Sequence, residues 1–297
     1  NPGLSGTIDA ASTGRADVYT LSTESKDGTR IPVTLFLPPA TRPCGVVVQV
    51  YGAYGISLEG PFDPFTDDLM SRGIAVAYCH VRGGGENGPE WHRQAWGIHR
   101  ERSIEDLFAG LSLLQNHPAI AADRIVLSAA SAGCLIAATA CLREPTRLRG
   151  LQLVHPFLDP VTALMNSGAR LTTTDWTEFG DPRNDDEVKT VLEQLSPIRI
   201  VAKMPHRSQR LPSAWIRGAR CDARVDTDAV ERFSRLYRSA SCATEPGHVT
   251  CRIIEGGHLG GSSANQAYEE NLLSHAWLID TLAARSPGMA AWRSNDI

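Results

Sequence analysis

The stretch Arg124-Ile-Val-Leu-Ser-Ala-Ala-Ser131-Ala-Gly133-Cys-Leu-Ile136 is an apolar run that ends in small residues and passes into a helical pattern. It predicts a strand, a sharp turn and a helix. Such a turn lifts Ser131 clear of the sheet, with backbone N–H groups and the positive end of the helix dipole facing whatever the hydroxyl attacks. Ala129 replaces the first glycine of Gly-x-Ser-x-Gly. The pattern alone leaves open whether Ser131 is a nucleophile or part of a packed turn.

Strands and helices alternate on both sides of this turn, which predicts an α/β fold with a doubly wound, mostly parallel sheet. An antiparallel hairpin is expected before the first buried strand. The Ser103-x-x-Asp106 pattern is a candidate capping box. The expected strands are 45–51, 73–80, 124–128, 151–155, 214–217 and 249–254, and the expected helices are 65–71, 103–116, 131–142, 226–239 and 263–283.

Three segments divide the chain. Residues 1–16 are rich in small residues without periodicity, which indicates a linker or an N-terminal remnant. Residues 17–297 are expected to form one catalytic domain. Within it, residues 156–212 interrupt the alternation and predict an insertion over the carboxyl edge of the sheet, where ligands bind in open α/β folds.

Composition excludes several classes of protein. The 297 residues are 42% hydrophobic and 21% charged, and a net charge of −4 gives no basic surface for nucleic acid or acidic membranes. No apolar run is long enough to span a membrane. Seven scattered cysteines without a Cys-x-x-Cys pair suit a reducing, cytoplasmic setting. The chain starts at Asn1 rather than Met, so a processed start stays open.

An activated serine needs a base, and that base needs a carboxylate to orient it. Asp222 directly follows the predicted strand 214–217, and His258 follows the strand 249–254 between two pairs of glycines. With Ser131 they have the order nucleophile, acid, histidine of α/β-hydrolases. The alternatives are a helix-capping role for Asp222 and an ordinary loop position for His258. We predict that these three residues form a catalytic triad.

The segment Ala77-Tyr-Cys-His-Val-Arg-Gly-Gly-Gly-Glu86-Asn-Gly-Pro-Glu-Trp-His92 resembles the Arg-Gly-Gly-Gly-Glu-x-Gly-x-x-Trp signature of the prolyl oligopeptidase-type serine peptidases, and oligopeptidase B in particular. The resemblance covers residues 17–285. It implies an α/β-hydrolase fold and an acyl-enzyme mechanism without metal or cofactor. Arg82 and Glu86 become candidates for substrate binding, although they could instead be a structural pair in a tight loop.

Two further motifs carry the resemblance. Val50-Tyr51-Gly-Ala-Tyr54-Gly is similar to the family segment in which a tyrosine hydroxyl donates to the oxyanion. This implies Tyr51 as one oxyanion donor and the backbone N–H of Ala132 as the other. Packing at the strand end is the alternative for both tyrosines. Arg224 matches the family arginine that holds a substrate carbonyl, for which a guanidinium is suited, and is otherwise a surface charge.

The stretch Leu171-Thr-Thr-Thr-Asp175-Trp-Thr-Glu178-Phe-Gly180 resembles the oligopeptidase B segment whose acidic side chains receive Arg or Lys before the cleaved bond. Asp175 and Glu178 keep the negative charge, whereas Thr177 replaces an acidic residue. This departure weakens the expected preference for basic residues. The family tryptophan that stacks on proline is not at the matching place, which lowers the expected specificity for proline.

Family members carry an N-terminal β-propeller, and here residues 1–16 alone precede the predicted domain. The fold is therefore expected without the propeller, or as part of a longer protein. We predict a serine hydrolase that cleaves short peptides, with a basic preference left open. An esterase or an acyltransferase of a biosynthetic pathway is the second hypothesis. The third, motivated by Ala129, is a catalytically silent binding module. The oligomeric state stays open.

Overall fold

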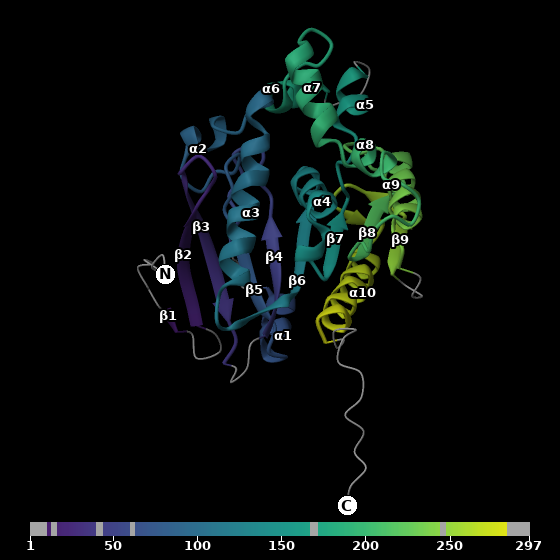
Figure 1. Cartoon of the computed structure of the whole chain (residues 1–297). Coiled ribbons are helices and arrows are strands. Elements are labelled where there is room, and N and C mark those ends of the chain that lie inside the picture. The colour runs from purple at the N-terminus through teal and green to yellow at the C-terminus, as the bar shows by residue number, and fades with distance from the viewer. Residues whose placement is uncertain are drawn as a thin grey trace, which may run out of the picture.

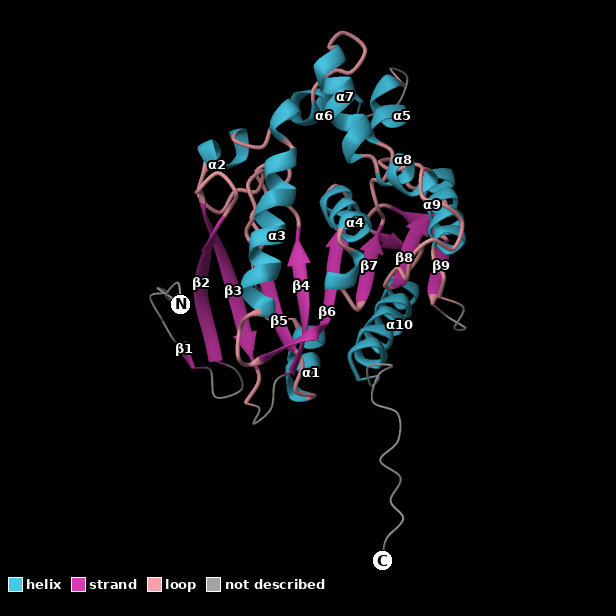
Figure 2. Cartoon of the chain, viewed as in Figure 1, coloured by secondary structure: helices cyan, strands magenta, loops and turns pink. Residues whose placement is uncertain are grey.

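The computed structural model describes residues 11–12, 17–39, 44–59, 63–166, 172–243 and 248–283. These residues form a nine-stranded sheet with helices on both faces, shown in Figures 1 and 2. The sheet is antiparallel at its first edge and parallel from β5 to β9. In spatial order its strands are β1 (Ala11–Ser12), β2 (Asp17–Glu24), β3 (Arg30–Leu37), β5 (Ala75–Cys79), β4 (Cys44–Val50), β6 (Ile120–Ala130), β7 (Gly150–Val154), β8 (Ser213–Ala219) and β9 (Val249–Ile254).

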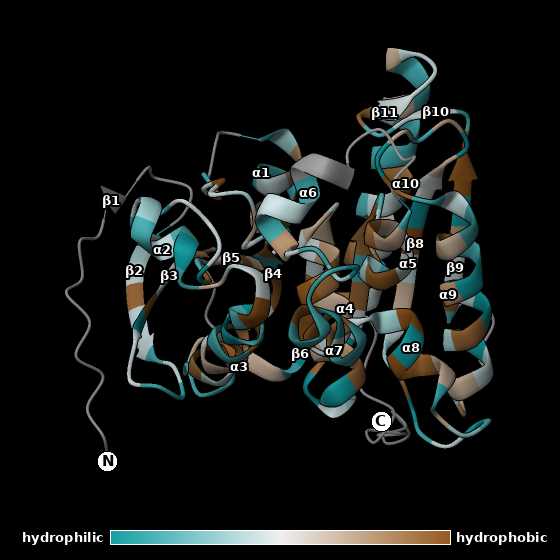
Figure 3. Cartoon of the chain, turned by 90° about the horizontal axis from the view of Figure 1, so that it is seen from above, coloured by the Kyte–Doolittle hydropathy of each residue, from teal (hydrophilic) through white to brown (hydrophobic). Residues whose placement is uncertain are grey.

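Helices cover both faces, as Figure 3 shows from above. Leucines of α1 and α10 pack on one face of the sheet, whereas apolar residues of α3, α4, α8 and α9 join the larger core on the other. Strands covered on both sides are apolar throughout, which explains the continuous burial of β5. The helices are α1 (Pro64–Ser71), α2 (Pro89–Arg93), α3 (Glu101–Gln115), α4 (Gly133–Arg143), α5 (Pro160–Met165), α6 (Thr172–Phe179), α7 (Asp186–Leu195), α8 (Pro197–Ala202), α9 (Thr227–Ala240) and α10 (Ala264–Ala283), with short 3-10 turns at Gly97–His99 and Pro145–Arg147.

Helices α5, α6 and α7 lie above the carboxyl ends of the parallel strands (Figure 1). Helix α8, near the end of the predicted insertion 156–212, does not lie over the strand ends. Its residues Ile198 and Val201 are buried in the core beside α4 and α9. The predicted insertion of residues 156–212 therefore has two parts. Helices α5, α6 and α7 cover the strand ends, whereas α8 belongs to the layer of helices that packs on one face of the sheet.

The expected α/β fold and its alternating elements are confirmed, with boundaries that differ by a few residues. The capping box is wrong. Helix α3 begins before it, Ser103 donates to the carbonyl of Arg82, and Asp106 accepts from the Arg82 side chain. Most of the predicted linker of residues 1–16 lies outside the described residues, but residues 11–12 pair with β2. No helix in the described ranges is long and apolar enough to cross a membrane.

Candidate active site

Ser131 lies on the turn between β6 and α4 in left-handed backbone, with φ of 50°. This region is unfavourable for residues other than glycine, so the surrounding structure must hold it. The backbone N–H of Ser131 donates to the carbonyl of Val154 at 2.9 Å, and its carbonyl accepts from the N–H of Phe157 at 3.1 Å. The end of β7 therefore fixes the turn that presents the Ser131 hydroxyl.

The two small residues that flank Ser131 have different tasks. A Cβ on Gly133 would come within 2.8 Å of the carbonyl oxygen of Val50, so only glycine lets α4 approach β4 this closely. Ala129 instead occupies a regular β6 position, paired with Val50 and with Leu153 of β7. The turn thus keeps its left-handed serine with alanine in place of the first glycine.

His258 lies between Ser131 and Asp222. Its Nε2 is 2.9 Å from the Ser131 hydroxyl, and its Nδ1 is 2.9 Å from Oδ2 of Asp222. The histidine stands at the tip of the short hairpin formed by β10 (Gly256–Gly257) and β11 (Gly260–Gly261). When Nδ1–H donates to the carboxylate, Nε2 is left as an acceptor for the serine proton. The structure brings all three predicted residues together in this order.

Asp222 is held as an anion. Its side chain has no exposed surface. Burial alone would raise the pKa of its carboxyl, but the imidazoles of His155 and His258 and the backbone N–H groups of Arg224 and Val225 together lower that pKa. The two N–H groups donate to Oδ1 at 2.8 and 3.0 Å. Asp222 can therefore orient the His258 ring and stabilise a positive charge on it.

Tyr51 follows the last residue of β4 and lies next to Gly133, at the start of α4. Burial and the neighbouring Glu178 carboxylate raise the pKa of its hydroxyl, so this group keeps its proton at neutral pH. Ala132 precedes the first residue of α4. Backbone N–H groups at this end of a helix have no intrahelical acceptor. Both groups can serve as hydrogen-bond donors beside the Ser131 turn.

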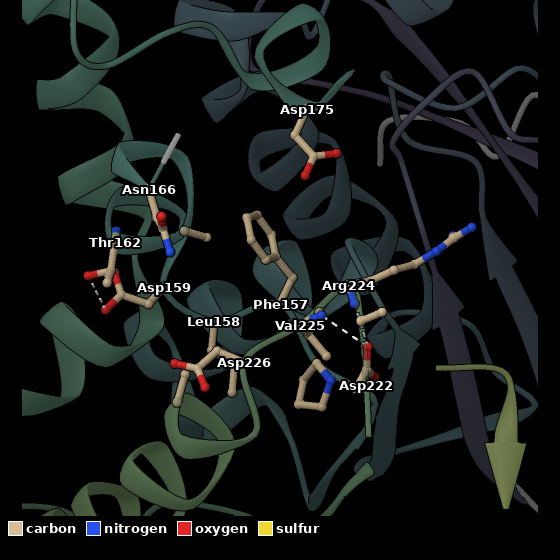
Figure 4. Close-up of a pocket in the computed structure, with 14 residues that line it drawn as sticks. Phe157, Leu158, Asp159, Thr162, Asn166, Asp175, Asp222, Arg224, Val225 and Asp226 are labelled. Carbon is tan, nitrogen blue, oxygen red and sulfur yellow. Dashed lines mark hydrogen bonds between the residues drawn. The ribbon is translucent and has the colours of Figure 1, made fainter. Parts of the chain in front are cut away.

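A cavity of about 260 Å³ opens beside Asp222, between the loops that follow β7 and β8. Figure 4 shows the ring of Phe157 in this cavity, with Asp175 beyond it. Four aspartates and one arginine, Arg224, are among the fourteen lining residues, so the cavity favours positive charge. Asp175 accepts a hydrogen bond from the hydroxyl of Tyr54 at 2.8 Å. Arg224 and Asp175 thus lie where the sequence predicted a substrate site.

Glu178, the other predicted acid, is not among the residues that line this cavity. Its side chain is 3% exposed. Its carboxylate accepts hydrogen bonds from the guanidinium of Arg100 and from the N–H of Tyr54, the latter at 2.9 Å. It also lies 2.6 Å from Nε2 of His92. The Glu178 carboxylate was expected to face a substrate, but these contacts with the protein itself already occupy its oxygens. Glu178 supports the loop of Tyr54 instead.

The structure contradicts a substrate contact of Arg82 and the alternative pairing of Arg82 with Glu86, and a role of Glu86 in substrate binding stays a prediction. The Arg82 side chain is 1% exposed and is bound by Asp106 and Asp27, so it cannot reach a substrate. It also does not pair with Glu86, whose Oε1 accepts from the N–H of Leu58 at 2.9 Å and lies 3.3 Å from His80. The triple-glycine motif therefore builds a closed loop beside the strand ends.

His155 and Phe157 follow β7 directly at the same edge as Ser131. His155 ends the predicted strand 151–155 and was therefore a candidate to line the site, whereas Phe157 was not among the predicted site residues. Their position after a parallel strand was the available signal. Nδ1 of His155 lies 3.4 Å from Oδ2 of Asp222. Within the described residues, His155, Asp222 and His258 form a group whose side-chain donor atoms lie within 4.8 Å of one another.

Comparison with known proteins identifies relatives of this chain. A model of the prolyl oligopeptidase family matches residues 62–284. The prolyl endopeptidase-like proteins of Pongo abelii and Homo sapiens are 32% and 30% identical over 75% and 80% of this chain, which are 30% and 33% of those proteins. Oligopeptidase B from Leishmania major superimposes with a TM-score of 0.82 at 22% identity, over 92% of this chain and 37% of that one.

The chain thus spans about a third of the length of the relatives it matches. The family match covers most of its parallel sheet and includes the Ser131 turn, the Asp222 loop and the His258 hairpin. With its α/β-hydrolase fold, the chain belongs to the prolyl oligopeptidase family.

Proposed function

We propose that this chain is the catalytic domain of a serine peptidase that cleaves short peptides through an acyl-enzyme. Ser131 is the nucleophile, His258 the general base and acid, and Asp222 the residue that orients the imidazole. The observation that carries the proposal is the continuous contact from the Ser131 hydroxyl through His258 to the buried Asp222, with both distances at 2.9 Å.

In the first half of the reaction, Ser131 Oγ attacks the acyl carbonyl carbon while its proton passes to Nε2 of His258. The C=O electron pair moves to the carbonyl oxygen. The Tyr51 hydroxyl and the Ala132 N–H donate to this oxyanion, where their effect is largest because the charge develops there. Collapse of the intermediate expels the amine, which takes the proton from His258. Water then repeats the sequence on the acyl-enzyme.

We propose a preference for peptides with a basic residue near the cleaved bond. The cavity beside Asp222 supports it, because Asp159, Asp175 and Asp226 line this cavity together with Asp222. Arg224 supplies one positive charge at the same wall, and its guanidinium can donate to a backbone carbonyl of the substrate.

A two-stage experiment tests this function. First, a fluorophosphonate probe should label the purified protein at Ser131 and should fail to label a Ser131→Ala variant. A folded protein that is not labelled would support the silent binding module. Second, an untreated portion of the same preparation is assayed on matched amides and esters of Arg, Lys, Pro and Ala. Hydrolysis of Arg and Lys amides supports the peptidase, whereas turnover of esters alone would favour an esterase or acyltransferase.

A further inference from the structure

His155 is a second imidazole at Asp222 to which the proposed mechanism gives no task. It follows the last residue of β7 and has left-handed backbone, with φ of 48°. Its N–H donates to the carbonyl of Arg217 at 2.7 Å, which holds this bend. The bend places the His155 ring beside the His258 ring, with centroids 5.6 Å apart.

The His155 ring is buried without matching hydrogen bonds. The residue is 4% exposed, and neither ring nitrogen has an aligned hydrogen bond to a described residue. The 3.4 Å contact between Nδ1 of His155 and Oδ2 of Asp222 is longer than an ordinary hydrogen bond. A buried polar group normally has a partner, because an unpaired one costs free energy. The unpaired nitrogens of His155 therefore point to a ligand.

Two imidazoles and one carboxylate are a donor set that Zn²⁺ accepts, with metal–ligand distances of about 2.0–2.2 Å. In a tetrahedral site, bonds of that length put ligand atoms roughly 3.3–3.6 Å apart. Oδ2 of Asp222 already lies 2.9 Å from Nδ1 of His258 and 3.4 Å from Nδ1 of His155. One donor atom of each residue lies within 4.8 Å of the other two, so an adjustment of the side chains would bring the three atoms to these separations. His258 lies at the tip of a hairpin with four glycines, whose backbone torsion angles can change at a small cost in free energy.

We propose that His155, Asp222 and His258 form an inhibitory zinc site. The proposal rests on the proposed function, in which His258 is the base. Zn²⁺ binds Nδ1 of His258 and replaces the proton that this nitrogen shares with Asp222. The displaced proton is carried on Nε2 of the neutral ring, so no proton is lost and no oxidation occurs. Nε2 then faces Ser131 as a donor and cannot accept the serine proton.

Calorimetric titration with ZnCl₂ in a buffer that does not chelate metals tests the site without depending on activity. We use the Ser131→Ala protein, which keeps all three donors. One zinc ion should bind, and a His155→Asn change in this background should weaken binding at least tenfold. Asparagine tolerates left-handed backbone, and His155→Gln is the second variant should the first fail to fold. Absence of binding at 1 mM zinc, or unchanged affinity in both His155 variants, would overturn the proposal.

Inhibition is measured next on proteins that retain Ser131. Zinc should reduce hydrolysis at the concentrations at which it binds, and EDTA should restore it. With each rate expressed relative to the zinc-free rate of the same protein, His155→Asn should raise the half-inhibiting zinc concentration at least tenfold over that of the parent. Cys221 is the matched control, because its exposed thiol lies next to Asp222 in the chain. Cys221→Ser should leave inhibition unchanged; loss of inhibition in this variant alone would assign the zinc to the thiol.

The two proposals fail separately. Zinc binding that requires His155, in a protein that hydrolyses no substrate, would contradict the proposed function and leave the metal site. Hydrolysis that depends on Ser131, in a protein that does not bind zinc, would do the reverse.

Discussion

Asp106 and Asp222 are two carboxylates whose side chains have no exposed surface. Asp106, on α3, accepts from the Arg82 guanidinium through both oxygens, at 2.9 and 2.7 Å, and from the Ser25 hydroxyl at 2.6 Å. Asp222, in the loop after β8, accepts from two backbone N–H groups and contacts two imidazoles. Neither side chain is exposed, but the chemistry of their partners differs.

That difference separates a structural ion pair from a reactive one. The Arg82 guanidinium does not lose its proton in proteins, so its bidentate pair with Asp106 fixes the loop after β5 and exchanges nothing. An imidazole gains and loses a proton near neutral pH. At Asp222 the buried charge therefore supports the proposed base, His258, which would take the proton of Ser131. In this pair of carboxylates, only Asp222 has partners that can exchange a proton near neutral pH.

The largest loss of activity is expected at Ser131, the residue of the Ser131–His258–Asp222 network that would react with the substrate. Ser131→Ala removes the proposed nucleophile and should lower kcat for peptide amides by roughly 10⁶. Ser128→Ala is the matched control, because the Ser128 hydroxyl contacts Gln152 within the sheet and belongs to no reactive chain. Equal rates for Ser131→Ala and the parent protein would contradict the mechanism.

Asp222→Asn keeps the size of the side chain and removes its charge. It should lower kcat by about 10⁴, because an amide favours the wrong tautomer of His258. Stopped assays of kcat, with a thermal melt of the same preparation, check this expectation. A variant that retains most of its activity would show that Asp222 is as structural as Asp106.

Asp106→Asn tests the other side of the comparison. It removes the fully buried one of the two carboxylates that pair with Arg82, leaving only the half-exposed Asp27, and should destabilise the domain by about 3–5 kcal/mol. Urea unfolding measures the free energy, and active-site titration with the fluorophosphonate normalises the rate to the folded fraction. The rate per labelled site should change little. A loss of kcat comparable to that of Asp222→Asn would abolish the distinction between the two networks.

Tyr51→Phe removes one proposed oxyanion donor while keeping the ring that packs beside Gly133. Loss of such a donor should lower kcat by roughly 10²–10³ with little effect on KM, because the bond forms in the transition state. Tyr54→Phe is the comparison, because that hydroxyl already donates to Asp175. If Tyr54→Phe proves the more damaging change to kcat, the oxyanion assignment is wrong.

Asp175→Asn is expected to have the smallest effect. Removing one carboxylate from the cavity wall should reduce kcat/KM for Arg substrates by about tenfold, or 1.4 kcal/mol, relative to matched neutral substrates. The ratio of the two kcat/KM values is the measurement. A ratio equal to that of the parent protein would remove Asp175 from substrate recognition.

Much of the fold and the candidate site could be predicted because the signals are local. The alternation of apolar strands with helical periodicity identified the parallel sheet, and parallel strands end at one edge. Ser131, Asp222 and His258 each directly follow such a strand or lie a few residues beyond it, so their proximity in the structure follows from the strand order β6, β7, β8 and β9.

The chain's own pattern thus determined where a serine, an acid and a histidine could meet. The three-dimensional packing decided which charged side chains pair with one another inside the protein and so do not face a substrate. Arg82 and Asp106 are separated by 24 residues, and Glu178 and Arg100 by 78, so no local period links either pair. The contact of His155 with Asp222 likewise depends on a left-handed bend at the end of β7. Such contacts arise from the simultaneous packing of several loops, because each partner is placed by a different element of the sheet.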